Sequence, residues 1–256
     1  AVAVTADTVA AATLTLDAKA NANASSSFTV SDAATVNIVT SATASGTYDL
    51  DAVVLDNADT TSLAITGSGV ASAVLTTDVI TGTDQLASLT ATTSAAGATI
   101  QTGTVVDADS LTSLTLNATY ANITIGAVGG SGSAEGLAAI TMNASNGATA
   151  SVGAITADST DSATDNAMVI TASTDSTSTV DFGAVTNTFG TIDMTVTGAG
   201  TLDANGGSDI FDAAGISKDY DNFYDENGNF KESVFRGYEL TQSFEVQSKS
   251  VDLVEQ

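Results

Sequence analysis

Short apolar-x-apolar triplets recur along most of the chain, with Thr, Ser and Asn between and around them. Alternation of apolar and polar positions, with many β-branched residues, is typical of pleated, half-buried strands. The triplets return at a nearly even spacing. A period of about 25 residues indicates stacked structural repeats. The triplets begin at Leu14, Val36, Leu63, Leu89, Leu114, Ile140, Met168 and Ile192.

A second pattern repeats with a similar period. Glycine stands between two short apolar stretches at Gly103, Gly126, Gly153 and Gly183. Glycine accepts backbone angles that other residues adopt only at a cost, so we interpret these positions as corners between short strands. Four triplets also have an apolar residue three positions upstream. These residues are Leu86, Leu111, Leu137 and Phe189.

Together the two patterns predict an all-β fold, a parallel β-solenoid of about eight coils of about 25 residues over residues 1–215. The absence of proline agrees, because proline cannot donate to a strand ladder. A Greek-key sandwich is the alternative, since its strands also recur every 8–12 residues or so. It would not need to repeat the glycine corner.

The outward residues of such a solenoid could form a threonine array of the kind that binds ice. Read from the triplets, the central outward row is irregular, which disfavours ice binding. That row is Ala64, Thr90, Thr115, Thr141, Val169 and Asp193.

Residues 216–256 differ in composition from the rest of the chain. They hold seven of the 13 aromatic residues and four of the five cationic ones. Asn227-Gly228 is a strong hairpin-turn signal. We predict a C-terminal β cap, because solenoids need polar ends for solubility. A docking or secretion tail is the alternative, and the two roles are compatible.

Composition excludes several classes of function. The chain has no Cys and no His, which excludes zinc fingers, thiol nucleophiles and Ser-His-Asp triads. A net charge of −25 disfavours binding to nucleic acid or to an anionic membrane. No apolar run approaches the roughly 20 residues of a membrane-spanning helix, so no membrane insertion is expected. An apolar content of 43% argues against disorder.

The acidic residues suggest a metal rather than ion pairs. Between residues 20 and 217 there are 19 Asp or Glu and no Lys or Arg. Calcium binds six to eight oxygen ligands of the kind that Asp-, Asn- and Gly-rich turns provide. For the chain as a whole we therefore expect at least one Ca²⁺ site, with Asp107 and Asp109 as one candidate pair. The alternative is a solvated acidic surface that binds no metal.

The best local calcium candidate is the segment 205–211, Asn-Gly-Gly-Ser-Asp-Ile-Phe. It resembles a single, incomplete copy of the calcium-binding RTX nonapeptide. The carboxylates around its Gly206-Gly207 turn are Asp203, Asp209 and Asp212, which we expect to be metal ligands.

Catalysis is not expected, and no catalytic residue is assigned. A glycosidase needs two carboxylates on opposite faces of the sugar, and in practice aromatic platforms as well. The chain has no Trp, and its sole arginine, Arg236, lies in the tail.

The Ala/Thr/Asp-rich composition and coils such as Leu111-Thr112-Ser113-Leu114-Thr115-Leu116 resemble bacterial surface-layer proteins. The resemblance covers residues 1–215. It implies an RTX-related, type I-secreted extracellular protein on the cell surface that assembles with itself into a calcium-dependent sheet or filament. A cell-surface polysaccharide is a second candidate partner. The chain departs from that class, because we recognise in it no separate anchoring domain and no run of RTX nonapeptides. A fragment or a filament subunit would explain both. The alternative is a repeat segment of a type I-secreted adhesin or another binding module.

Overall fold

A computed structural model gives the backbone of most of the chain. The described residues are 2–16, 27–42, 46–55, 60–69, 73–82, 85–93, 99–129, 134, 136–157, 168–186, 192–204, 214–224 and 230–242. Their secondary structure is entirely β. The chain divides into two compact units, Ala1–Asn205 and Gly206–Gln256, and each is described separately.

The first unit consists of strands β1 to β17, which shorten along the chain. The first five are 8 to 15 residues long, and the later ones two to eight. Their bounds are β1 Val2–Leu16, β2 Phe28–Ala42, β3 Gly46–Leu55, β4 Ser62–Gly69, β5 Ala73–Thr81, β6 Ser88–Thr93, β7 Thr99–Val106, β8 Ser113–Thr119, β9 Ile123–Ile125, β10 Ala139–Ser145, β11 Thr149–Val152, β12 Ile155–Thr156, β13 Met168–Thr174, β14 Thr179–Phe182, β15 Val185–Thr186, β16 Ile192–Gly198 and β17 Thr201–Ala204.

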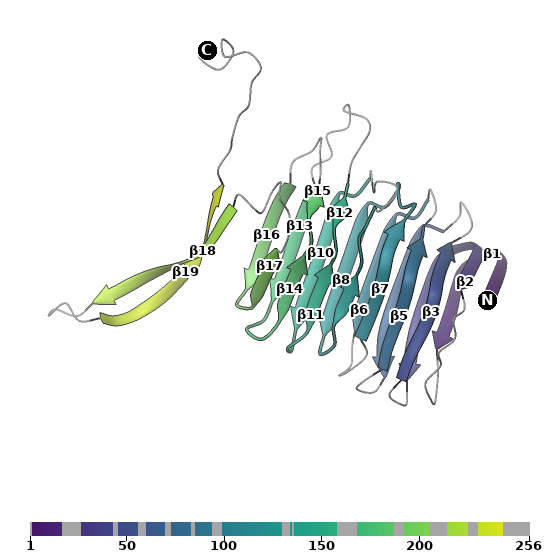
Figure 1. Cartoon of the computed structure of the whole chain (residues 1–256), viewed down its shortest axis with the longest axis horizontal. Coiled ribbons are helices and arrows are strands. Elements are labelled where there is room, and N and C mark those ends of the chain that lie inside the picture. Colours follow the sequence, from purple (N-terminus) through teal and green to yellow (C-terminus); the bar gives the residue numbers. More distant parts are fainter. Residues whose placement is uncertain are drawn as a thin grey trace, which may run out of the picture. The chain divides into compact units, whose positions relative to one another are not determined.

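Every strand of this unit pairs in parallel with strands of neighbouring turns (Figure 1). The first face runs in the order β2, β4, β6, β8, β10, β13, β16, and the second face in the order β3, β5, β7, β9, β11, β14, β17. A short third ladder joins Val105, Val128, Ile155 and Val185. Parallel pairing between successive turns confirms the β-solenoid and excludes the Greek-key sandwich, whose strands pair antiparallel.

The expected number of coils is corrected by the structure. The solenoid has about five turns rather than about eight. Short, separate strands joined by corners run from β6 to β17, whereas β1 to β5 are longer. β2 also bends from one face to another, pairing with β3 through Phe28–Val30 and with β4 through Thr35–Ala42. Counting apolar triplets therefore overestimated the number of turns, because three of the eight triplets, at Leu14, Val36 and Leu63, lie on the long strands β1, β2 and β4.

The core is a stack of the predicted inward residues. Leu114 pairs with Ile140, and Leu116 with Met142, and all four side chains are fully buried. The upstream residues Leu86, Leu111 and Leu137 are buried too, while Phe189 lies outside the described residues. Burial of such apolar rows contributes about 25 cal/mol per Å² removed from water, which makes this row the main stabilising element of each turn.

The register differs from the triplet alignment at two places, each time by two residues. Leu14 pairs with Ile38 rather than with Val36. Ile140 pairs with Ile170 rather than with Met168. The step from β10 to β13 is therefore longer than the triplets suggest. It equals the spacing of the two corner glycines Gly153 and Gly183, which is the better guide to register.

The four corner glycines form a ladder, but not for the reason expected. None of them has positive φ, and the positive-φ glycines are Gly129, Gly147 and Gly198. The corner positions lack a side chain because successive turns approach closely there. A Cβ on Gly126 would lie 2.5 Å from the carbonyl carbon of Gly103, and one on Gly183 would lie 2.6 Å from that of Gly153. Gly153 and Gly183 do stand between short strands, as predicted, but the reason given for glycine there was wrong: it is close contact between turns and not a positive φ.

The second unit is described over one antiparallel pair, β18 (Ala214–Tyr224) and β19 (Phe230–Gln242). Tyr224 pairs with Phe230 across the connection, as a hairpin requires. The predicted Asn227-Gly228 turn itself lies outside the described residues. The role of residues 216–256 as a cap stays a prediction.

Candidate functional site

The outward side of the first face is an ordered array of small hydroxyl and amide side chains. We call it the threonine face and define it as the outward residues of β2 (residues 35–42), β4, β6, β8, β10, β13 and β16. With the longer step from β10 to β13, its central row differs from the irregular row expected. The row reads Asn37, Ala64, Thr90, Thr115, Thr141, Thr171 and Thr195.

The neighbouring row of the threonine face is also polar and uncharged over most of its length. It reads Val39, Thr66, Thr92, Asn117, Asn143, Ser173 and Thr197. The described side chains of both rows are half-buried or exposed. Within this row Asn143 Nδ2 donates to Asn117 Oδ1 at 2.8 Å, and further along the same strands Ser145 Oγ donates to Thr119 Oγ1 at 3.4 Å. These side-chain hydrogen bonds between successive turns help to hold the array in position.

Charge is distributed unevenly between the two faces. Residues 35–42 of β2 and the strands β4, β6, β8, β10 and β13 contain no charged residue. Asp193 in β16 is the one carboxylate in the strand segments of the threonine face. The strands of the second face carry five carboxylates, Asp49, Asp51, Asp78, Asp181 and Asp203. A chain with 30 acidic residues thus keeps one large surface almost neutral.

The predicted calcium ligands are only partly described. Asp107 and Asp109 are exposed in the turn before β8, where Asp107 has φ 51° and the Asp109 carbonyl accepts a hydrogen bond from Gly136 N at 3.0 Å. Asp203 lies on β17, whereas Asp209 and Asp212 lie outside the described residues. Among the described residues, no three or more acidic side chains gather as a metal site would require.

Asp203 has one acidic neighbour that the sequence did not reveal. It pairs in register with Asp181 on β14, so the two carboxylates lie side by side on the second face. Asp181 accepts a hydrogen bond from Ser151 Oγ at 3.0 Å, which comes from the preceding turn. Two adjacent carboxylates repel each other unless a cation or water separates them. Ser151 and Asp181 have the same spacing as the corner glycines Gly153 and Gly183, so this spacing could have placed them side by side. Asp203 lies beside Asp181 on the following turn.

A second missed residue is Asp175, in the turn after β13. Its carboxylate accepts hydrogen bonds from Ser178 Oγ at 2.6 Å and from Thr177 N at 3.0 Å. It also accepts one from the backbone N–H of Asn146, one turn earlier. These donors, the Ser178 hydroxyl foremost, hold the pKa of Asp175 well below its usual value. Asp175 therefore fastens two successive turns together.

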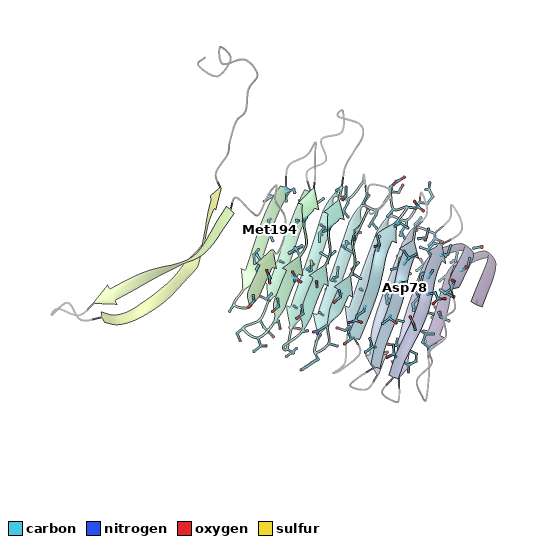
Figure 2. All side chains as sticks on the ribbon, in the orientation of Figure 1. Asp78 and Met194 are labelled. Carbon is cyan, nitrogen blue, oxygen red and sulfur yellow. The ribbon has the colours of Figure 1, made fainter. Side chains whose placement is uncertain are left out.

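The last turn of the solenoid exposes part of its apolar row. Ile192 and Met194 pair with Met168 and Ile170, which are fully buried, yet Ile192 and Met194 are themselves half-exposed. Met194 lies on β16, far along the solenoid from Asp78 on β5 (Figure 2). Among the strands that the structure describes, β16 and β17 each have a partner on one side only. An end of this kind can accept a further parallel strand.

Comparison with known proteins identifies no relative: no family model, no curated protein and no solved structure matches this chain significantly. Within the part of the chain that the structure describes, no helix is long and apolar enough to cross a membrane.

Proposed function

We propose that the protein is an extracellular, self-assembling structural subunit of a surface layer or filament, and that copies associate end to end along the solenoid. The observation that carries this proposal is the half-exposed apolar row of the last turn, made by Ile192, Met194 and Val196. Equivalent residues one turn earlier are fully buried by their neighbours. A second copy that stacked on this end would bury the row in the same way, and residues 216–256 would then serve as the docking tail rather than as a cap.

The opposite end supports the same geometry. β1 pairs with β2 alone, and Leu14 and Leu16 on it are half-exposed. Because all strands of the solenoid run parallel, the β16 end of one copy and the β1 end of another can continue a single ladder. This contact is heterologous, and repetition of a heterologous contact gives an open filament.

Calcium is proposed to permit this contact rather than to build the fold. Copies of net charge −25 repel each other over about 8 Å at physiological ionic strength. Asp193 and Asp203 both lie on the last turn, close to the proposed junction. Monovalent salt only screens such carboxylates, whereas Ca²⁺ also bridges them. Asp203, beside Asp181, is the carboxylate to replace first.

The extracellular location and the second candidate partner, a cell-surface polysaccharide, rest on the resemblance to surface-layer proteins. No catalytic activity is proposed, and glycan cleavage by the purified protein would contradict the proposal. The alternative, a repeat segment of a secreted adhesin, needs no end-to-end contact. It predicts a protein that stays monomeric when calcium is added.

Electron microscopy and light scattering test the proposal. Purified protein is compared in millimolar Ca²⁺, in NaCl of matched ionic strength and in chelator. We expect filaments or sheets in Ca²⁺, and a substantial loss of assembly in Met194→Glu, which places a charge in the junction. Thr201→Glu adds the same charge to the same turn outside the apolar row and should assemble. Monomers in all three solutions would contradict end-to-end assembly, and equal assembly in Ca²⁺ and NaCl would contradict the role of calcium.

A further inference from the structure

The threonine face has no assigned role in end-to-end assembly, yet it is the least charged surface described on this acidic chain. Over its seven strands it carries a single carboxylate, Asp193, at one end. Approach of two copies through the second face brings carboxylates together, among them Asp49, Asp181 and Asp203. Electrostatic repulsion therefore favours the threonine face over the second face for a lateral contact between two copies.

The chemistry of the face is complementary to itself. Each Thr or Ser hydroxyl is both a donor and an acceptor, and each Asn amide offers both groups. Two such faces can satisfy each other, whereas two carboxylate-rich faces cannot. The hydroxyl rows also share one repeat, because strands of both copies are spaced about 4.8 Å apart. Stacked polar rows of this kind can interdigitate between sheets.

The size of the face agrees with a stable contact between proteins. Seven strands at about 4.8 Å cover about 34 Å, and six residue steps of about 3.3 Å cover about 20 Å. The product is about 700 Å² per copy, close to the roughly 800 Å² that each partner buries in an interface of standard size.

We propose that two copies of this chain pair laterally through their threonine faces, with the solenoids antiparallel about a twofold axis. An antiparallel arrangement places the two Asp193 carboxylates at opposite ends of the interface, so they do not meet. Thr115, the fourth of the seven residues in the central row, then lies at the axis, and Thr141, one strand further on, lies near the axis and inside the interface. The inference rests on the proposed self-assembly and deepens it by adding a lateral contact to the axial one.

The test separates the two contacts by working in chelator with Met194→Glu, in which the axial contact is blocked. Sedimentation equilibrium measures the dimer dissociation constant of this variant, of Met194→Glu/Thr141→Glu and of Met194→Glu/Thr149→Glu. Thr149 is the matched control, because it lies in the next strand of the same turn but on the second face. Circular dichroism confirms that all three are folded.

We expect Met194→Glu to dimerise. Adding Thr141→Glu should weaken the dimer about tenfold or more, because it buries a charge without a partner in the interface. Adding Thr149→Glu should change the dimer little. A monomer at every concentration, or equal weakening by both Glu substitutions, would overturn lateral pairing while leaving axial assembly intact. Inhibition of ice recrystallisation by monomeric Met194→Glu, lost only with Thr141→Glu, would also overturn it and assign the face to ice.

Discussion

The glycine ladder provides the sharpest test of why this solenoid stacks as it does. In Gly126→Ala the new Cβ would lie 2.5 Å from both the carbonyl carbon and the oxygen of Gly103. Ordinary contacts between such atoms are about 3.5 Å, so the turns must separate by about 1 Å. No flexible side chain can move aside, because the atoms that the Cβ meets are backbone.

The cost follows from what that separation disrupts. Gly126 N donates to Gly103 O at 3.2 Å, and Val105 N donates to Ala127 O at 2.8 Å across the same pair of turns. An opening of about 1 Å breaks one or both bonds at about 0.5–1.5 kcal/mol each. Overpacking adds about 1–3 kcal/mol. We expect a loss of about 3 kcal/mol in the free energy of unfolding.

Thermal and chemical unfolding followed by circular dichroism measure this loss, and hydrogen exchange locates it. Exchange should rise at Gly126 and its neighbouring turns and change little in β3, because a repeat contacts only its neighbours. Gly147→Ala is the control: its Cβ meets nothing within 4 Å, but its φ of +79° is unfavourable, at a cost of about 1–2 kcal/mol. If Gly147→Ala proved the more damaging, backbone angle rather than close approach would govern these glycines, and our reasoning would be refuted.

Two further predictions concern the buried apolar row and Asp175, whose hydrogen bonds join two successive turns. Leu116→Asp should destabilise the protein by about 3–5 kcal/mol in denaturant titrations, because it buries an unpaired charge between Ala91 and Met142. The control Thr115→Asp lies one position away and points outward, so it should cost far less stability. Similar losses of stability in the two variants would contradict the inward position of Leu116. Asp175→Asn should lower the melting temperature at neutral pH. Because the pKa of Asp175 is depressed in the folded state, its contribution is fully present above the ordinary Asp pKa and is lost as the pH falls below it. The melting-temperature difference between wild type and Asp175→Asn should therefore shrink below about pH 4. A difference independent of pH would disprove the stabilising role of the ionised Asp175 carboxylate.

Much of the fold could be predicted from local pattern. Alternating apolar positions placed Leu114, Leu116, Ile140 and Met142 inside, since a strand must bury one side and expose the other. The even spacing of the triplets predicted stacked parallel turns. These features depend on composition and spacing along one stretch of chain, which a sequence displays directly.

Register between turns was decided only by the tertiary structure. The triplets at Ile140 and Met168 look equivalent, but a slip of two residues preserves the inward side and so leaves no trace in an alternating pattern. The stacking of Gly183 on Gly153 selects between the two registers, because a Cβ there would collide with backbone. In this register Thr141 lies beside Thr171 and not beside Val169, so the central outward row consists mainly of threonine.

The candidate sites depended on the same long-range information. Asp181 lies beside Asp203 only because β14 and β17 pair in register, and Asp175 reaches Asn146 only because one turn stacks on the next. Residue spacing alone favoured clusters near in sequence, such as Asp107 with Asp109. In a solenoid the near neighbours of a side chain lie a full turn away along the chain. Sequence thus determined which side of each strand is buried, and only stacking decided which side chains meet.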